Sequence, residues 1–436
     1  MNRTVCAALF CAALAITGAC GKDDRRAGSD GDGMNTVAEG YVKLVLAVGP
    51  HDADFVDAYY GPPEWRQEAE ATKTPLATLL DRAAGLSMRA SGISTPSTGL
   101  ERLRLLYLRR QLDAVSARLR MLQGERLSFD AESQALYDAV APTQPESAFQ
   151  DVLTQLEKRF PGSGPLVERY ESFRQAFVIP KDKLDHVFQT AIGACRERTA
   201  RHLTLPEGES FTVEYVTNKS WSGYNWYQGS FRSLIQVNTD LPIYIDRAID
   251  LACHEGYPGH HVYNALLEKH LVKDRGWVEF SVYPLFSPQS LIAEGTANYG
   301  IDVAFPGEER VKYEQQVLFP AAGLDPARAE EYYQVQSLVS RLEYAGNEAA
   351  RRYLDGTIDA RQAADFLEQY ALMPRPRAEQ RVRFFDQYRS YVINYNLGKD
   401  MVRDFVEREA AGDPQKRWTV FEGLLSSPRL PSGLRP

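Results

Sequence analysis

The sequence predicts a mainly α-helical protein with a small antiparallel β-sheet, in which two helical lobes surround a cleft. Three observations support this fold class. Apolar residues recur at three- and four-residue steps through much of 36–204, and again from Ile243 to the end of the chain. Two β-branched and aromatic runs, 211–216 and 234–238, separate these helical stretches. The chain has 436 residues, of which 44% are hydrophobic, enough for a sizeable core.

The first 20 residues have the pattern of a bacterial export signal. A short positive region ending at Arg3 precedes an apolar run, 5–16, that is too short to span a membrane comfortably. Small residues then lead to Cys20, as in a lipobox, where the cysteine becomes the lipidated first residue. We therefore expect a signal peptide over 1–20, lipidation of Cys20 and location at the periplasmic face. Cleavage without lipidation is the alternative, because Thr17 stands where the lipobox usually has leucine.

The rest of the chain divides by composition. Residues 21–35 are mostly Gly, Asp, Lys, Arg and Ser, which predicts a flexible tether. A helical lobe is expected over 36–204, and nothing in it resembles a catalytic motif. A catalytic lobe is expected over 205–436, beginning with the two predicted strands. Glycine- and proline-rich breakers separate the helices of the first lobe at 49–50, 61–63, 91–98, 142–145 and 161–165.

Charge and cysteine content exclude some classes of function. The net charge is −8, and an acidic surface argues against nucleic-acid binding, which relies on basic side chains to displace counterions. No later segment is apolar enough to span a membrane, so a lipid is the only membrane attachment expected. Cys195 and Cys253 are interpreted as small buried residues rather than as a disulfide. The sequence carries no signal for an oligomeric state.

A histidine-rich segment, 252–261, carries the strongest functional signal. His254 is followed directly by Glu255, as in the HExxH helix of zinc hydrolases. In that helix two histidines one turn apart bind the metal, and the glutamate is the general base. Here the position of the second histidine is occupied by Pro258.

His260 and His261 are the candidates for the second histidine ligand. In an unbroken helix, His261 would lie two turns from His254, a rise of roughly 10 Å, which is too far for both to bind one ion. Pro258 and Gly259 interrupt the helix, because proline removes a hydrogen bond and glycine tolerates unusual dihedral angles. A two-residue bulge returns His260 to the ligand position, whereas His261 needs a three-residue bulge. We prefer His260 and keep His261 as the alternative.

This segment and a second one, 294–299 (Glu-Gly-Thr-Ala-Asn-Tyr), together resemble the bacterial domain-of-unknown-function 885 family, which is placed among zincin-like metallopeptidases. The second segment also resembles the Glu-Gly-x-Ala motif of gluzincin aminopeptidases, whose glutamate is the third zinc ligand. The resemblance implies a gluzincin-like peptidase in which His254, His260 and Glu294 bind one Zn²⁺ and Glu255 is the general base.

The chemistry of these residues suits that role. Two neutral imidazoles and one carboxylate leave a fourth position for water, whose pKa the metal lowers while it polarises a substrate carbonyl. Glu255, beside a ligand, can take the proton from this water and deliver it to the leaving amine. Asn298 lies one helical turn after Glu294 and is placed to orient a ligand histidine.

Residues near the C-terminus are candidates for transition-state and substrate contacts. The resemblance includes a late Tyr-x-x-Gly element, matched by Tyr395 and Gly398. The hydroxyl of Tyr395, or of Tyr391 one turn earlier, would stabilise an oxyanion. Arg389 would bind a substrate carboxylate. Core packing is the alternative interpretation of these residues.

The predicted sheet supplies two further candidates. In gluzincins an edge strand placed like 234–239 pairs with the substrate backbone, so Asn238 is an expected substrate contact. Trp226 lies in the aromatic connection between the predicted strands and is expected to wall the cleft. An ordinary strand and ordinary aromatic packing are the alternatives.

We therefore expect a zinc peptidase that acts on short peptides. Two alternatives stay open: a metal-binding or catalytically degenerate lipoprotein that acts as a binding module, and a zinc amidase or esterase with a non-peptide substrate. Glu255 distinguishes the first alternative from an enzyme, because a pure binding site needs no carboxylate beside the first ligand.

Overall fold

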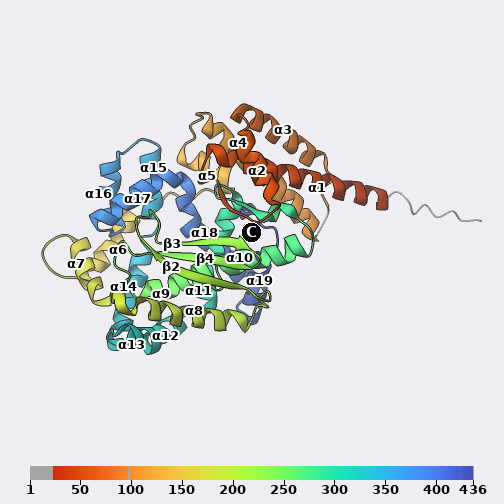
Figure 1. Ribbon diagram of the computed structural model, residues 1–436. Helices are drawn as coiled ribbons and strands as arrows, with labels where there is room; N and C mark the ends of the chain where they lie inside the picture. Colours follow the sequence, from red (N-terminus) through yellow and green to blue (C-terminus); the bar gives the residue numbers. More distant parts are fainter. Residues whose placement is uncertain (1–22, 97–98, 436) are drawn as a thin grey trace, which may run out of the picture.

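Two small sheets and a large set of helices make up the protein. Figure 1 shows the larger sheet among the helices of the computed structural model. The structure describes residues 23–96 and 99–435. The predicted fold class, mainly helical with a small antiparallel sheet, is confirmed. The predicted signal peptide and Cys20 lie outside the described residues. Within the described ranges, no helix combines the length and hydropathy needed to cross a lipid bilayer.

The N-terminal helices end and begin at the predicted breakers. Prolines stand at or just before the starts of several of them, where their fixed φ angle and missing N–H do no harm. The helices are α1 (Asp23–Val48), α2 (Pro63–Thr72), α3 (Leu76–Gly92), α4 (Gly99–Leu122), α5 (Phe129–Tyr137), α6 (Glu146–Arg159), α7 (Leu166–Arg174) and α8 (Leu184–Ala200).

Helix α1 differs from the sequence prediction at its start. The structure is helical from Asp23, within the segment 21–35 that was expected to be a flexible tether. The segment 23–36 contains no proline, and extending an existing helix forms one hydrogen bond for each residue added. The buried part of α1, from Met34 onward, supplies the helix that this extension continues. Figure 1 shows the start of α1 projecting from the body of the protein.

The larger sheet contains β2 (Ser210–Val216), β3 (Gly223–Gly229) and β4 (Arg232–Asn238), in the order β2-β4-β3. Strands β3 and β4 are antiparallel and are joined at Ser230 and Phe231, which both have positive φ angles as tight hairpin turns require. The two strands expected from the sequence, β2 and β4, instead pair in parallel. The reason is that their presumed connection is itself a strand, so the chain reverses twice.

This strand order corrects a second expectation. Strand β4 is hydrogen-bonded on both sides, so it is not the edge strand that was expected to pair with a substrate. Strand β3 is an edge of the sheet instead. A separate two-stranded antiparallel sheet joins β1 (Val56–Tyr59) to β5 (Val282–Pro284).

The C-terminal half is helical again, as the periodicity predicted. It contains α9 (Asp246–Leu251), a π-helical turn (Ala252–Gly256), α10 (His260–Leu267), α11 (Pro288–Ala304), α12 (Glu309–Tyr313), α13 (Phe319–Ala322), α14 (Ala329–Ser340), α15 (Ala345–Leu354), α16 (Ala360–Tyr370), α17 (Arg375–Tyr388), α18 (Ile393–Ala410) and α19 (Pro414–Leu425).

Two hydrophobic clusters form the core, and each takes residues from both sides of residue 205. One joins the N-terminal helices to α15–α17, and includes Leu112 and Phe385. The other joins α8 and the larger sheet to α10 and α19, and includes Phe188 and Phe421. Helix α11 contributes to both clusters and is buried along almost its whole length. It therefore has a rigid position between them.

Cys195 and Cys253 form a disulfide, with their Cα atoms 5.7 Å apart. The interpretation of two unpaired buried cysteines was therefore wrong. The two residues are separated by 58 positions and form no recognisable framework, so their proximity depends on how α8 packs against the π-helical turn. The bond attaches α8 to the residue that directly precedes His254.

Candidate metal centre

A break in the helix places His254 and His260 together. The π-helical turn (Ala252–Gly256) carries His254 and ends with the Tyr257 N–H donating to the Ala252 carbonyl at 3.1 Å. A new helix, α10, then begins at His260. The interruption predicted at Pro258 is present, but the irregular backbone is longer than a two-residue bulge. Single π-helical turns of this kind often occur at functional sites.

Gly259 makes this break possible. Its N–H donates to the Cys253 carbonyl at 2.9 Å. A Cβ atom at this position would overlap the backbone carbonyls of Cys253 and His254. Because a backbone carbonyl cannot move aside as a flexible side chain can, only glycine fits where the chain folds back against the π-helical turn.

Three potential ligand atoms converge at this break. The Nε2 atoms of His254 and His260 are 3.1 Å apart, and Oε2 of Glu294 lies 3.3 Å from the first and 3.8 Å from the second. Ligand atoms about 2.0–2.2 Å from a tetrahedral zinc ion lie roughly 3.3–3.5 Å from one another. Oε2 of Glu294 is buried and has no hydrogen-bond partner among the described residues. His254, Glu255 and His260 also form a group that could hold a metal ion. The donor set therefore fits a metal.

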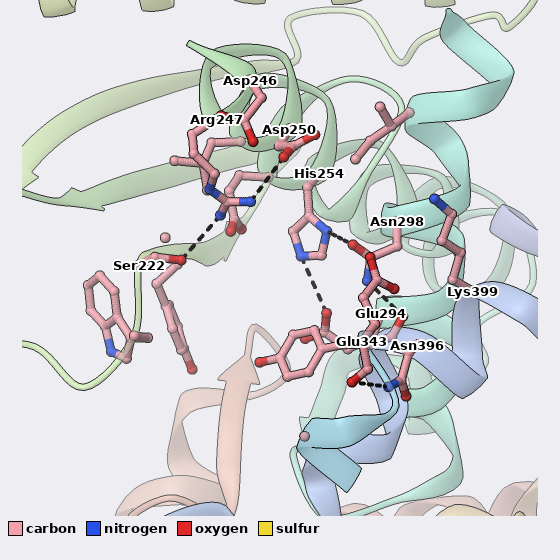
Figure 2. A pocket seen from close by; sticks show the side chains of 18 of the residues that line it. Ser222, Asp246, Arg247, Asp250, His254, Glu294, Asn298, Glu343, Asn396 and Lys399 are labelled. Atoms are coloured by element: carbon pink, nitrogen blue, oxygen red, sulfur yellow. Dashed lines mark hydrogen bonds and ion pairs between the residues drawn. The ribbon is translucent and has the colours of Figure 1, made fainter. Parts of the chain in front are cut away.

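Neighbouring polar groups hold these ligands in place (Figure 2). Nδ1 of His254 lies 3.1 Å from Oδ1 of Asn298, which leaves Nε2 free to bind a metal when Nδ1 carries the proton. The Asn298 amide in turn donates to the Tyr395 carbonyl at 3.2 Å. The Tyr391 hydroxyl donates to Oε1 of Glu294 at 2.8 Å. Each contact restricts the orientation of a ligand.

The electrostatics of the site favour a cation. Burial alone would raise the pKa of Glu294, but contacts with His254 and His260 lower it well below its usual range. Burial would lower the pKa of His260, but Glu294, Glu255 and Asp57 raise it to about 9. Burial raises the pKa of Asp57 to about 7, with Glu294 and Glu255 adding to the rise and His260 opposing it. Three carboxyl groups therefore surround the two imidazoles.

His261 faces away from this site. It is fully buried, with Nε2 lying 3.0 Å from Oε2 of Glu209 and Nδ1 lying 2.9 Å from the Ser233 hydroxyl. Successive residues on a helix point about 100° apart, so His260 and His261 cannot face the same site. The structure thus places His260, and not His261, beside His254.

A close crossing of α11 and α18 explains the two glycine-containing motifs. A Cβ on Gly295 would overlap the Gly398 carbonyl, and a Cβ on Gly398 would lie 2.8 Å from the Leu291 carbonyl oxygen. The backbones therefore touch where Glu294 enters the site from α11. This contact brings Tyr391, just before α18, within hydrogen-bond distance of Glu294.

The two tyrosines predicted near the site are both there. Tyr391 and Tyr395 line the same cavity as the histidines, with their ring centroids 5.7 Å apart. Burial raises the pKa of both hydroxyls well above the ordinary value, and the nearby charge of Glu294 adds to the rise. Tyr391 also packs against Tyr137 in the core, so packing and a contact with the site coexist.

The other predicted contacts have different surroundings. The Arg389 guanidinium forms an ion pair with buried Glu132 at 2.7 Å and does not line the cavity, so its position does not support a substrate contact. The indole of Trp226 is 41% exposed, lies outside the cavity and donates to Gln236. Asn238 does line the cavity, but its amide donates to two backbone carbonyls of the preceding loop.

The cavity has a volume of about 940 Å³ and extends from the histidines to α14 and α17. Its lining includes Asp57, Arg377 and Arg381, none of which was predicted from the sequence. Asp57, from β1, accepts a hydrogen bond from the Tyr224 hydroxyl. Arg377 and Arg381, from α17, line the side formed by that helix. The four-residue spacing of the two arginines could have indicated that they share a helix face. A lone aspartate in a short strand carries no such pattern.

Comparisons with known proteins support the fold more than the chemistry. No family model and no curated protein sequence matches the chain, so the resemblance to the domain-of-unknown-function 885 family stays a prediction. The structure is similar to that of a candidate lipoprotein from Colwellia psychrerythraea, with a TM-score of 0.52 and 14% identity over 84% of this chain and 70% of that chain.

Two further structures are less similar. A candidate lipoprotein of unknown function from Shewanella oneidensis has a TM-score of 0.46 and 13% identity, over 86% of this chain and 78% of that one. Metallocarboxypeptidase 1 from Trypanosoma cruzi has a TM-score of 0.48 and 12% identity, over 94% of this chain and 90% of that one. At such identities, the Colwellia likeness shows a shared fold, and any function has to be argued from the metal centre itself.

Proposed function

We propose that this protein is a zinc-dependent hydrolase that cleaves short peptides. His254, His260 and Glu294 bind the metal, and Glu255 is the general base. The observation that carries the proposal is the convergence of two imidazole nitrogens and one carboxylate oxygen within 3.1–3.8 Å of one another. Imidazole and carboxylate ligands with one open position are typical of catalytic zinc sites.

The two glutamates have different surroundings, which supports giving them different roles. Oε2 of Glu294 faces both Nε2 atoms, and its other oxygen is held by Tyr391. Glu255 follows His254 directly, and its Oε1 lies close to Gly223 at the start of edge strand β3. No hydrogen bond to the Glu255 carboxylate is seen among the described residues, so this group is free to accept a proton from water.

Besides the three metal ligands, the proposed mechanism uses Glu255, Tyr395 and Asn298. A zinc ion supplies Lewis acidity, which acidifies water and polarises the substrate carbonyl. Glu255 accepts the proton from the attacking water and passes it to the leaving amine. The Tyr395 hydroxyl is the better placed oxyanion donor, because the Tyr391 hydroxyl is already bonded to Glu294. Asn298 keeps the His254 ring in the orientation that presents Nε2.

The cavity supports a small substrate. At about 940 Å³ it is near the upper end of the usual range for small-molecule sites, and it is walled by both the sheet and the C-terminal helices. A short peptide fits this space, whereas a folded protein chain does not.

Metal analysis tests the ligand set. Purified wild-type protein should contain one zinc ion per chain, and His254→Ala and Glu294→Ala should each lose it. His270→Ala is the matched control and should keep the metal, because His270 lies outside the cavity and pairs with Asp274. Zinc retained by both ligand variants would reject this site.

Glu255→Gln tests turnover separately from metal binding. This variant should keep its zinc but cleave a library of short peptides about 10²- to 10⁴-fold more slowly, the usual contribution of a general base. Unchanged cleavage would exclude Glu255 as the base. A zinc-loaded wild-type protein that cleaves no peptide, ester or amide would favour a binding module, and cleavage of esters or acyl amides alone would favour a non-peptide substrate.

We also propose that the protein is exported and attached to a bacterial membrane through a lipid on Cys20. The small residues before this cysteine support the assignment, and the Colwellia protein of similar fold is itself a candidate lipoprotein. Cys20→Ala should move the protein from the membrane fraction to the soluble fraction. Membrane association that survives this substitution would contradict lipid attachment at Cys20.

A further inference from the structure

Two arginines on α17 form a part of the cavity that the proposed mechanism does not use. Arg377 and Arg381 are four residues apart, so they lie on the same face of the helix. Both line the cavity that also contains His254 and Glu255. The exposed Arg383 of the same helix does not.

Neither guanidinium has a polar partner in the part of the chain that the structure describes. No ion pair or hydrogen bond joins Arg377 or Arg381 to any acceptor, and Nε of Arg381 is buried without a partner. Other arginines of the same cavity are paired: Arg247 contacts Asp250 at 3.2 Å, and Arg310 contacts the same carboxylate at 2.8 Å. The missing partners are therefore particular to this end of the cavity.

Both arginines are half-buried, so leaving their charges without a protein partner costs part of their hydration. Burial lowers the pKa of Arg381, with Tyr395 opposing the shift. Burial also lowers the pKa of Arg377, the like charges of Arg174 and Arg247 add to this, and Tyr244 and Glu171 oppose it. Removing a charge from water costs free energy unless hydrogen bonds or an opposite charge replace the lost hydration. An anion that entered from solvent would supply both.

Aromatic rings hold the Arg381 side chain in place. Its guanidinium carbon lies 4.6 Å from the ring centroid of Phe384, and 5.7 Å from that of Tyr395. Such cation–π contacts orient the guanidinium without satisfying its N–H groups. Tyr395 also neighbours Tyr391, whose hydroxyl is bonded to Glu294. The Tyr395 ring therefore lies between Arg381 and the residues of the metal centre.

We propose that Arg377 and Arg381 bind a carboxylate of the substrate. The planar fork of an arginine donates two parallel hydrogen bonds to a carboxylate, and two adjacent arginines give such a group a strong preference over a neutral one. The lining around the two histidines carries Asp57, Glu255 and Glu294, which repel a free carboxylate. A peptide would thus lie with its carboxylate on α17 and its scissile bond at the metal.

The carboxylate has two sources in peptides, the C-terminus and an acidic side chain. The expected effect on peptide cleavage rests on the proposed hydrolase function, whereas the expected binding of a carboxylate does not. Binding is therefore measured first, by calorimetry on the full-length chain stripped of metal, so that no peptide is consumed. One pair of probes is trialanine and its C-terminal amide. The other is acetyl-Ala-Glu-Ala-amide and acetyl-Ala-Gln-Ala-amide.

In wild-type protein the charged member of at least one pair should bind about 10- to 100-fold more tightly than its neutral partner, as expected for hydrogen bonds between charged groups. The pair that shows the difference identifies the source of the carboxylate. Arg381→Gln and Arg377→Gln should each remove most of the preference. Arg381→Lys should recover part of it, because the charge remains but the fork is lost. Arg383→Gln is the matched control and should preserve it.

With zinc-loaded enzyme, the same variants should raise KM for the preferred peptide with little change in kcat, because the contact is present in both the bound substrate and the transition state. Equal binding of charged and neutral probes by wild type would overturn the proposal, as would a preference that survives in both glutamine variants. A wild-type preference for the charged probe without any peptide cleavage would support the carboxylate site while rejecting the proposed hydrolase function.

Discussion

The two ends of the cavity differ in how their charged groups are held. At the metal end, His254 and Glu294 each have a polar partner that fixes their orientation, in Asn298 and Tyr391. At the arginine end, Arg381 is held by aromatic rings alone, and its guanidinium lacks an acceptor among the described residues.

This difference indicates what each end can bind. A metal site needs ligands that already point at one position, since reorienting them would reduce affinity. The arginine end instead offers N–H donors that lack acceptors, and an incoming anion would supply those acceptors. On the proposed roles, the protein combines a preorganised cation site with an incomplete anion site, and four predictions test this contrast.

The largest effect is expected at the backbone contacts of the metal end. Gly259→Ala should abolish zinc binding and lower the free energy of unfolding by about 3 kcal/mol or more, because the new Cβ would overlap two backbone carbonyls. Chemical denaturation and metal analysis measure both effects. Gly193→Ala in α8 is the control: it has open space around it, so stability should stay the same or rise. A stable, zinc-loaded Gly259→Ala protein would show that the metal end is less rigid than the structure indicates.

Zinc affinity should depend strongly on pH. In the metal-free protein, nearby carboxylates raise the pKa of His260 to about 9, whereas its unfolded value is near 6.5. Zinc must displace this proton, so apparent affinity should rise about 50-fold from pH 7 to pH 9. Calorimetry in buffers of different ionisation enthalpy should detect about one proton released per zinc at pH 7.5. Zinc binding that releases no proton and does not change with pH would contradict this assignment.

The same shift affects stability with a defined sign. A histidine whose folded pKa is raised stabilises the protein most at pH values below its unfolded pKa. For metal-free protein, this contribution of His260 should be fully present below about pH 6.5 and be lost as the pH rises through about 9. Metal binding reverses the dependence, because zinc favours the neutral ring.

The smallest effect is expected at the arginine end. Arg381→Met should leave the free energy of unfolding unchanged or raise it by up to about 1 kcal/mol, because an apolar side chain keeps the packing and avoids burying an unpaired charge. Arg310→Met is the contrasting variant in the same cavity. It should lower stability by about 3–5 kcal/mol, since it leaves buried Glu314 without its cation and leaves Asp250 with Arg247 alone. Equal losses in the two variants, measured by denaturant unfolding, would show that Arg381 is structurally paired.

Much of the local structure was predictable because it depends on neighbouring residues. The breakers at Pro145 and Pro165 precede helices α6 and α7, since proline is tolerated at a helix start but not inside one. The interruption at Pro258 and Gly259 was predictable for the same reason. The preference for His260 over His261 followed from counting residues around that interruption, and the structure places His260 beside His254 and His261 beside Glu209.

Contacts between distant segments were less predictable. Nothing in the sequence shows that Arg389 meets Glu132, or that Cys195 meets Cys253, since each pair is separated by more than 50 residues. The parallel pairing of β2 with β4 was missed because the aromatic run between them was not recognised as a strand. That pairing decides which strand lies at the sheet edge beside Glu255.

The sequence by itself determined the residue types of the candidate metal centre and the place where its helix breaks, because both depend on chemistry and steric limits within a few residues. Only the tertiary structure decided which side chains share one cavity and which charges lack a partner. Whether a charged side chain has a partner depends on every residue that folding brings near it. Arg381, which lacks an acceptor, and Arg389, which pairs with Glu132, therefore cannot be distinguished in the sequence.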